Sequence, residues 1–339
     1  MTTARNVLTP DALAMMDVIA RSGSFAAAAR ELGKVPSALT YNVRQLEEAL
    51  DVLLFDRRSR QARLTAAGEE LLQEGRRLLE EMDAVANRVQ RVATGWESQL
   101  SIAVDGAISA TTVFELAEAF YAHLQAQAPA GTADAAPRGR SGTRLRLRTE
   151  VLSGTWEALT SGAADLAIGV ELGADRVAVG GLQTRPLGEI AFVFAVAPHH
   201  PLAAATEPLC DTDLMRHRAV AVADSAQRLA RTTVNLLPGQ DVLTVDSMEA
   251  KIEVQVRGLG CGFLPEPMAR VHVAAGRLVV KPTARPGLQG RFGYAWRNAT
   301  GGSRASLGLA LRWWLEQLES QTTRRALLER HGGPVPGSL

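Results

Sequence analysis

The sequence predicts a multidomain protein with an all-helical N-terminal part, a long linking helix and a two-lobed α/β C-terminal part. Three observations favour this architecture. Apolar residues recur at helical spacing in the first 50 residues, a seven-residue apolar repeat occupies residues 65–93, and short apolar strands alternate with helices from residue 100 onward. A chain of 339 residues is long enough for two or three domains that each bury a core.

The composition is that of a soluble globular protein, with 46% hydrophobic and 22% charged residues. A formal net charge of +1 excludes a uniformly basic nucleic-acid binder, so any basic surface must be local. The two cysteines, Cys210 and Cys261, have neither metal-ligand spacing nor a disulfide framework, which indicates buried thiols in a reducing compartment. The N-terminus has no apolar signal segment and no apolar run approaches about 18 residues. We therefore expect a cytoplasmic protein with no membrane partner.

The stretch 24–50 is typical of two short helices joined by a tight turn. Ser24 suits the N-cap of the first helix, Gly33 suits its end, and Pro36 suits the first turn of the second. The second helix carries an apolar stripe formed by Leu39, Val43, Leu46 and Leu50. A preceding helix begins near Pro10 and supplies further core residues, so that a three-helix core can be closed by Leu13, Met16, Val18, Ile19 and Phe25.

The face of the second helix opposite its apolar stripe is polar. Hydroxyls, a phenol and a guanidinium on the N-terminal half of a helix are the groups that helix-turn-helix proteins insert into the major groove of DNA. The alternative is an ordinary amphipathic helix pair with a solvated face. On the first interpretation, the candidate DNA-binding residues of this segment are Ser24, Pro36, Ser37, Thr40, Tyr41 and Arg44.

A basic hairpin is predicted next. The residues 53–55 are typical of a short apolar strand, and the seven residues 57–63 contain no acid and four arginines, namely Arg57, Arg58, Arg60 and Arg63. Unpaired arginines beside a recognition helix would contact phosphates or the minor groove, which adds affinity with little sequence information. A solvated surface loop is the alternative interpretation of this segment.

The long helix predicted for residues 65–93 carries a heptad repeat. Its apolar positions, spaced alternately by three and four residues, are Leu71, Gly75, Leu78, Met82, Val85, Val89 and Val92. So narrow a stripe usually packs against a partner helix, which predicts a homodimer. Gly75 marks either a weak point or a close approach of two backbones. The alternative is packing against the N-terminal domain of the same chain.

Two α/β lobes are predicted from residue 100 onward. In the first lobe the strands 100–104, 145–152 and 165–170 alternate with the helices 109–127 and 155–161. The apolar run 190–197 is typical of a buried strand that leaves this lobe, and a second lobe then occupies residues 199–277. The chain returns to the first lobe through residues 278–320. We expect a mobile insertion at 128–142 and a frayed tail over 321–339.

The sequence has no pattern of a catalytic or metal site. Its histidines and cysteines lack ligand spacing, and no serine lies in a GxSxG motif, so we expect no enzyme, no metal and no cofactor. Ligands of open α/β lobes bind beyond the carboxyl ends of strands and at helix N-termini. Three strand-to-helix turns fit this rule, and their candidate residues are Asp105, Ser109, Ser153, Thr155, Trp156, Asp246 and Ser247. Simple helix capping is the alternative for each hydroxyl.

The N-terminal motifs resemble those of the LysR-type transcriptional regulators. The matching strings are Ser22 to Phe25, Ala28 to Leu32, Leu46 to Glu47, Leu53 to Arg57 and Leu64 to Gly68. At the recognition helix the family commonly has Ser-Gln-Pro before Ala-Val-Ser, whereas this chain has Val35 to Ser37 before Ala38 to Thr40. The usual glutamine is absent, so the resemblance implies no particular operator sequence.

This resemblance implies a winged helix-turn-helix DNA-binding domain at 1–64, a linker and dimerisation helix at 65–95 and an effector-binding domain of periplasmic-binding-protein type at 96–320. The implied partners are double-stranded promoter DNA, a small-molecule effector held between the two lobes, and further copies in a homodimer or homotetramer, with RNA polymerase as a candidate partner. It adds further candidate effector-binding residues, which are Pro198, His200, Asp224 and Ser225. Because aspartates recur near the proposed cleft, we do not assume an anionic effector, although many effectors of the family are carboxylates.

A second interpretation uses only the two lobes. The chain would then be a solute-binding or ligand-transforming protein with an N-terminal dimerisation module. The arginine-rich hairpin and the missing signal peptide argue against this alternative.

Overall fold

The computed structural model describes residues 4–56, 62–127, 143–173, 181–285, 287–297 and 307–331. The chain forms two compact units, Met1–Val89 and Gln90–Leu339. The predicted hairpin arginines Arg57, Arg58 and Arg60 and the predicted insertion 128–142 lie outside the described residues.

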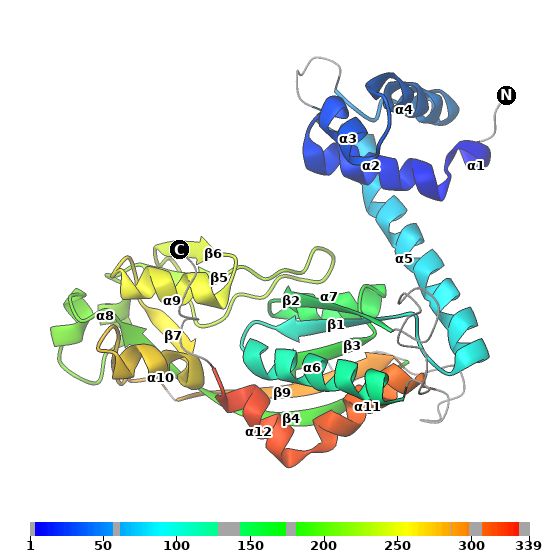
Figure 1. Ribbon diagram of the computed structural model, residues 1–339. Helices are drawn as coiled ribbons and strands as arrows, with labels where there is room; N and C mark the ends of the chain where they lie inside the picture. Colours follow the sequence, from blue (N-terminus) through cyan, green and yellow to red (C-terminus); the bar gives the residue numbers. More distant parts are fainter. Residues whose placement is uncertain are drawn as a thin grey trace. The chain divides into compact units, whose positions relative to one another are not determined.

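The first unit is a helical head whose second helix is capped at both ends. Its helices are α1 (Ala4–Val7), α2 (Pro10–Ser22), α3 (Phe25–Glu31) and α4 (Pro36–Leu50), followed by α5 (Ala66–Thr94), most of which belongs to this unit (Figure 1). The Thr9 hydroxyl accepts a hydrogen bond from the Ala12 amide at 3.2 Å and caps α2. Gly23 ends α2 with a φ of 65°, a left-handed conformation that favours glycine.

The core of the head confirms the predicted helical stripes. Three of the four stripe residues of α4 are fully buried and Leu50 is partly buried, together with side chains of the other helices, and the largest buried members are Met15, Met16, Ile19, Leu39, Leu46 and Leu54. Burying apolar surface in this way stabilises the head by about 25 cal/mol per Å². Met15 is a core residue that the sequence analysis missed.

A short hairpin follows α4. Phe55 and Leu64 form an antiparallel bridge, and the buried Glu47 carboxylate accepts a hydrogen bond from the Leu54 amide at 2.8 Å. A Cβ at Gly68 would overlap the Leu54 carbonyl oxygen, so the start of α5 approaches this hairpin as closely as only glycine permits. The predicted strand over 53–55 is therefore reduced to a single bridge, whose ends are held by Glu47 and α5.

The heptad stripe of α5 divides into two parts. At its start, Leu71 and Leu72 pack against the core of the head, and a Cβ at Gly75 would lie 2.9 Å from the Leu13 side chain of α2. The stripe beyond this point is solvent-exposed, with exposed fractions of 46% for Leu78, 53% for Met82, 48% for Val85 and 66% for Val89. Gly75 therefore faces the head of its own chain, as the alternative interpretation predicts. The stripe residues from Leu78 to Val89 are not buried by any of the described residues.

The second unit is built on one mixed sheet. Its strands are β1 (Gln99–Asp105), β2 (Arg144–Glu150), β3 (Leu166–Glu171), β4 (Leu182–Val196), β7 (Gly262–Pro265), β8 (Val279–Val280) and β9 (Leu288–Arg297). The order is β2-β1-β3-β9-β4-β7, with β8 also paired to β4. β1 is parallel to β2 and β3, whereas β9 is antiparallel to β3 and β4. The long strands β4 and β9 run through both lobes and so join them.

Helices cover both faces of the first lobe. α6 (Ala110–Ala126), α11 (Leu309–Glu319) and α12 (Gln321–Glu329) lie on one face, and α7 (Ser153–Ser161) packs against β1 and β3 on the other (Figure 1). Trp314 of α11 and Phe120 of α6 are fully buried between them. The prediction of a frayed tail after Ser320 is wrong for residues 321–331, because Leu327 and Leu328 of α12 are buried in this core.

The second lobe contains a smaller parallel pair of strands and its own helices. These elements are η1 (Pro201–Ala204), α8 (Asp211–Leu214), β5 (Ala219–Val222), β6 (Val242–Val245), α9 (Met248–Val256) and α10 (Glu266–Ala274). The sequence predicts strands near 219–222 and 242–245 and a helix over 247–257, which β5, β6 and α9 confirm, whereas it predicts no counterpart of η1, α8 and α10. β4 begins eight residues before the predicted strand at 190, because its N-terminal half alternates buried and exposed positions and lacks a continuous apolar run.

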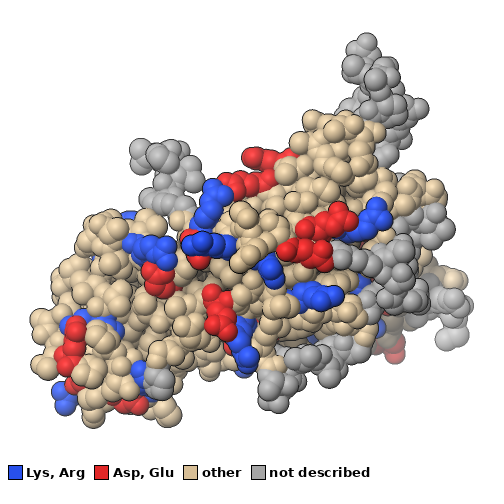
Figure 2. Space-filling view, turned by 90° about the horizontal axis from the view of Figure 1, so that it is seen from below, with Lys and Arg blue, Asp and Glu red and all other residues tan. Residues whose placement is uncertain are grey.

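The surface carries charges of both signs. In Figure 2, acidic and basic side chains of the described residues are interspersed on the face shown. Several charged residues of the described part of the chain form exposed pairs one helical turn apart, such as Arg325 with Glu329 at 3.1 Å. Exposed pairs contribute about 0 to 1 kcal/mol each, so they favour solubility more than stability.

Candidate nucleic-acid interface and ligand cavity

The exposed face of α4 is polar along its N-terminal half. Pro36, Ser37, Thr40, Tyr41 and Arg44 are all exposed, with 61% of Tyr41 accessible. The Thr40 hydroxyl donates to the Pro36 carbonyl at 3.0 Å, and the Tyr41 hydroxyl accepts from the Gln45 side-chain amide at 2.8 Å. None of the described residues forms a hydrogen bond or ion pair with the Arg44 guanidinium. These side chains are therefore available to a ligand of this face, and Gln45 belongs to it although the sequence analysis did not name it.

The two remaining described candidates have different surroundings. Ser24 is partly buried and its hydroxyl accepts from the Ala27 amide at 3.5 Å, so it caps α3 as well as lying beside the turn. Arg63 is exposed, and its carbonyl accepts a hydrogen bond from the Asp56 amide at 2.8 Å across the hairpin. Arg63 therefore lies on a second exposed element, the hairpin that follows α4 in the chain.

A cavity of about 170 Å³ lies between the two lobes of the second unit. The first lobe contributes the ends of β1 and β3, including Asp105 and Glu171, and the second lobe contributes Lys251 from α9. The joining strands β4 and β9 and the strand β7 add the three aromatic rings of Phe192, Phe263 and Phe292. The lining of the cavity therefore combines apolar rings with charged groups from both lobes.

Asp105 is the one predicted effector-binding residue that lines this cavity. Its carboxylate accepts hydrogen bonds from the Ala107 amide at 2.9 Å, the Leu152 amide at 3.2 Å and the Thr155 hydroxyl at 3.4 Å. Burial raises the pKa of Asp105 from 3.8 to about 6, against the effect of these hydrogen bonds, and the charge of Glu171 raises it further. The carboxylate therefore titrates closer to neutral pH than an ordinary aspartate does.

Lys251 is a buried lysine that the sequence analysis missed. Only 9% of it is exposed, and none of the described residues forms a hydrogen bond or ion pair with its ammonium group. Burial lowers the pKa of Lys251 to about 8, and the nearby Cys261 thiol partly opposes this shift. Burial also raises the pKa of Cys261 to about 12. An unpaired ammonium in such a place costs stability, because no protein group replaces its hydration.

Replacing Lys251 with methionine should therefore raise the free energy of unfolding at pH 7 by about 3 kcal/mol, the energy that corresponds to the drop in its pKa from 10.5 to about 8. The unfolded chain holds the extra proton between those two pH values, so the wild type should regain stability relative to the variant as pH rises from 8 to 10.5. Urea unfolding at pH 7 and pH 9 measures both effects.

Lys281 is the matched control for this prediction. It is equally buried, but its ammonium pairs with the Glu207 carboxylate at 2.6 Å and donates to the Ala203 and Ala205 carbonyls. Lys281→Met should destabilise the protein, because it removes one member of a satisfied cluster. A loss of stability in both variants would show that the Lys251 ammonium is satisfied in solution.

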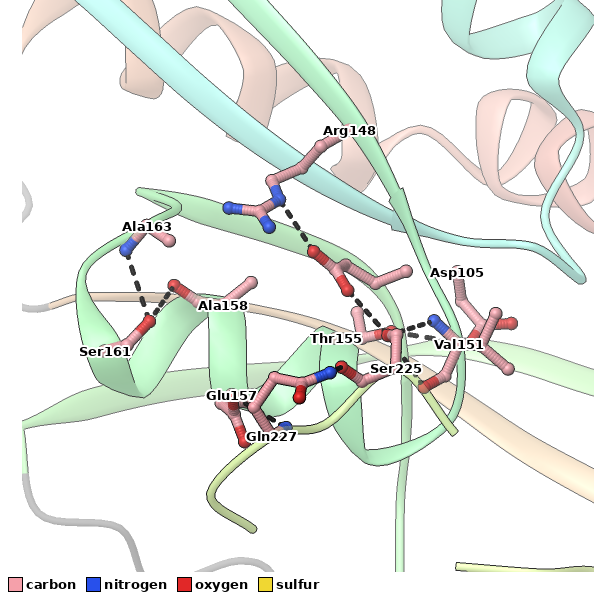
Figure 3. Close-up of polar contacts among 11 residues, drawn as sticks. Asp105, Arg148, Val151, Thr155, Glu157, Ala158, Ser161, Ala163, Ser225 and Gln227 are labelled. Atoms are coloured by element: carbon pink, nitrogen blue, oxygen red, sulfur yellow. Dashed lines mark hydrogen bonds and ion pairs between the residues drawn. The ribbon is translucent and has the colours of Figure 1, made fainter. Parts of the chain in front are cut away.

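Three predicted effector-binding residues, Ser153, Asp224 and Ser225, instead hold the lobes together. The Asp224 carboxylate of the second lobe accepts hydrogen bonds from the Ser153 and Gly154 amides at the start of α7, both at 3.2 Å. The Ser225 hydroxyl donates to the Glu150 carboxylate at 2.6 Å and accepts from the Val151 amide at 2.9 Å (Figure 3). Thr155, another predicted residue, is fully buried against Asp105 within the first lobe. We call the contacts of Asp224 and Ser225 with the first lobe the interlobe contact.

The interlobe contact extends along the loop that follows Asp224. The Glu157 carboxylate of α7 accepts hydrogen bonds from the amides of Gln227, Arg228 and Leu229 at 2.7 to 3.0 Å. Burial raises the pKa of Glu157, but these hydrogen bonds outweigh it and hold the pKa below its usual value. A Cβ at Gly154 would overlap the Ser225 hydroxyl, so this approach of the lobes requires glycine.

The other predicted effector-binding residues lie outside the cavity lining. Ser109 caps α6 and its hydroxyl donates to the Arg330 carbonyl, whereas Ser247 caps α9. Trp156 is buried in the core under α7, and its indole donates to the Glu171 carbonyl at 3.2 Å. Pro198 and Asp246 are exposed. The capping alternative therefore describes both serines. The cavity is lined instead by Asp105, which precedes Ser109, and by Lys251, which follows Ser247.

His200 is buried in the second lobe beside a second histidine. Its Nδ1 accepts a hydrogen bond from the Leu202 amide at 3.2 Å, and its ring centre lies 4.9 Å from that of His217. Burial lowers the pKa of His200, and the charges of His217 and His199 lower it further. Among the described residues, no group of three or more His, Cys, Asp or Glu is placed to hold a metal ion.

Of the two charged cavity residues that the sequence analysis did not name, Lys251 has a weak signal in the sequence and Glu171 has none. Met248, Lys251, Ile252 and Gln255 share one face of α9, so a charged residue interrupts an apolar stripe. Glu171 has no such signal, because it is the last residue of a buried strand, where a solvated charge is ordinary. Separately, no helix within the described residues combines the length and the apolar character needed to cross a bilayer.

Comparisons with known proteins agree with both parts of this geometry. Residues 10–69 match the family profile described as bacterial regulatory helix-turn-helix protein, lysR family, and residues 138–323 match the one described as LysR substrate binding domain. The second match covers more than half of the chain. The interpretation as a solute-binding or ligand-transforming protein with a mere dimerisation module is therefore wrong, because the N-terminal segment is itself a DNA-binding domain of this family.

Full-length relatives carry the same architecture. The uncharacterized HTH-type transcriptional regulator YeeY of Escherichia coli is 36% identical over 91% of this chain and 92% of its own length. The HTH-type transcriptional regulator YhaJ of Escherichia coli O157:H7 is 37% identical over 92% of this chain and 96% of its own length. The structure of full-length CbnR with its target DNA aligns with a TM-score of 0.52 and 17% identity, covering 91% of this chain and 98% of that one. These relatives are named as regulators rather than enzymes, and the chain belongs to the LysR family of DNA-binding transcriptional regulators, with a C-terminal substrate-binding domain.

Proposed function

We propose that two copies of this chain bind one promoter site, each placing α4 in the major groove. The observation that carries the proposal is the exposed polar face of α4, on which the Arg44 guanidinium has no partner among the described residues. Arg44 and Tyr41 read base edges on this proposal, while Ser37 and Thr40 contact phosphates or bases. Arg63 and the other hairpin arginines, Arg57, Arg58 and Arg60, bind phosphates and contribute affinity without specificity.

The exposed part of the α5 stripe supports a homodimer as the binding species. Four large apolar side chains at heptad spacing are exposed there, and a second α5 would bury them. A symmetric dimer requires a pseudo-palindromic operator with half-sites about one helical turn, or a whole number of turns, apart. Pairing of two dimers into a tetramer, contact with RNA polymerase and a cytoplasmic location complete the proposal.

The cavity between the lobes is the proposed effector site. A ligand there contacts both lobes, so it can favour one arrangement of the lobes by its differential affinity. The interlobe contact is the element that such a ligand would strengthen or replace, since Asp224 and Ser225 follow a strand that lines the same cavity. A coupling of about 1 to 3 kcal/mol would change operator affinity by about five- to 150-fold.

The Arg44→Ala variant tests the DNA-binding proposal. It should lower affinity for the operator by about 1 to 3 kcal/mol and relax the base preference at one position, because a guanidinium reads a base pair through paired hydrogen bonds. Arg63→Ala is the matched comparison. It should weaken binding to all duplexes alike and reduce the dependence of affinity on salt. Titrations of operator and random duplexes at two salt concentrations measure these losses, and equal losses on both duplexes for Arg44→Ala would refute its assigned role.

A further inference from the structure

The cavity between the lobes holds a charged group without a protein partner on the second lobe. Lys251 extends from α9 and is 9% exposed, and no described residue hydrogen-bonds or ion-pairs with its ammonium. The other buried lysine of the domain, Lys281, has a carboxylate and two carbonyls around it. The contrast indicates that the partner of Lys251 comes from outside the chain, because buried ammonium groups in proteins are normally paired.

The first lobe presents the opposite charge to the same cavity. Glu171 ends β3 and lines the cavity, and no described residue forms a hydrogen bond or ion pair with its carboxylate. Asp105 lines the cavity beside it, but its oxygens already accept three hydrogen bonds from the protein. Asp105 therefore has little remaining capacity, and Glu171 is the acceptor that a ligand would engage first.

The same cavity is lined by aromatic rings. Phe192, Phe263 and Phe292 come from three different strands and contribute to its lining. The volume of about 170 Å³ is below the range of about 300 to 1,000 Å³ that takes drug-sized molecules, so the ligand is a small metabolite. A ligand with only an anionic group would leave Glu171 unpaired, and one with only a cationic group would leave Lys251 unpaired.

We propose that the effector is a small zwitterion with an apolar body, of the amino-acid class. Its carboxylate binds the Lys251 ammonium of the second lobe, its amino group binds the Glu171 carboxylate of the first lobe, and its apolar part packs among the phenylalanine rings. Because the two charged ends contact different lobes, the ligand bridges them. This inference rests on the proposed function of the cavity as the effector site.

The first test compares a ligand with two analogues that each lack one charged group, using the full chain. Isothermal titration calorimetry with the twenty common amino acids identifies the tightest ligand, which is then compared with its des-amino acid and with its decarboxylated amine. Both analogues are smaller than the parent, so neither can fail through a clash. Each should bind about 30-fold or more weakly, because each leaves one buried charge unpaired. The absence of saturable binding by every amino acid, or an analogue that binds as tightly as its parent, would overturn the proposal.

The second test assigns the two charges. Lys251→Met should abolish the advantage of the amino acid over its decarboxylated amine, and Glu171→Gln should abolish its advantage over the des-amino acid. Glu189→Gln, at an exposed position of β4 outside the cavity lining, should leave both ratios unchanged. Unchanged ratios in Lys251→Met or in Glu171→Gln would overturn the assignment.

A separate measurement distinguishes the class of ligand from the proposed function. The ligand-free full chain is titrated with an operator selected from random duplexes. Failure to select or bind any duplex would refute the DNA-binding function, while the calorimetric comparison would still report on the ligand class. Selective binding of duplexes together with equal affinity for the three ligands would refute the zwitterion alone.

Discussion

Replacing Leu78 and Met82 of α5 together with glutamate should convert the proposed dimer into monomers and lower operator affinity by about 10²- to 10⁴-fold. The affinity falls this far because two linked heads bind two half-sites as one unit, and a monomer loses the second binding event. Both side chains are about half exposed in the single chain, so the substitutions remove no core contact of the head. Sedimentation velocity and operator titrations measure the two effects.

The control variant has the same change of net charge, but its two substitutions lie outside the exposed apolar stripe of α5. Gln73→Glu with Arg77→Gln also makes the chain more negative by two charges, and both positions are exposed on other sides of α5. This variant should remain dimeric. A dimer that survives Leu78→Glu with Met82→Glu would place the dimer contact outside the exposed α5 stripe.

Asp224→Ala should lower the free energy of unfolding of the second unit by about 3 to 5 kcal/mol and loosen the interlobe contact. The Asp224 carboxylate accepts hydrogen bonds from four backbone amides, those of Ser153, Gly154, Ala226 and Thr232, and the substitution leaves these donors without it. Urea unfolding measures the stability, and hydrogen exchange at residues 153–154 and 226–232 measures the local opening.

The pH dependence of this effect has a defined sign. Burial raises the pKa of Asp224, but the hydrogen bonds it accepts outweigh burial and hold the pKa below its ordinary value of 3.8. Its contribution is therefore complete above pH 3.8 and is lost as the pH falls through the lowered pKa. The difference between wild type and variant should persist from neutral pH down to about this value and shrink in stronger acid.

Asp246→Ala is the matched control for Asp224→Ala. Asp246 has the same charge and also follows a strand of the second lobe, but it is exposed. Its removal should leave stability within about 0.5 kcal/mol of the wild type. Equal stabilities for the Asp224 and Asp246 variants would show that the interlobe contact does not persist in solution.

The sequence by itself determined the helical head and the order of strands and helices in the first lobe. The stripe of α4 and the alternation of β1, α6, β2, α7 and β3 are local properties, because the side chains of one element repeat with the period of its own backbone. The family motifs likewise lie within one short stretch of chain. Boundaries were predicted to within a few residues, except for β4, whose first half lacks a continuous apolar run.

Only the tertiary structure decided which polar residues meet. Asp224 accepts from amides that lie 70 and 71 residues earlier in the chain, so no local pattern could tell a ligand-binding aspartate from one that joins two lobes. Gly75 faces its own head rather than a second helix because Leu13 occupies the space beside it. Lys251 and Glu171 line one cavity although they are distant in sequence. The paired strands β4 and β9 join the two lobes that carry them, and no local pattern predicts that pairing.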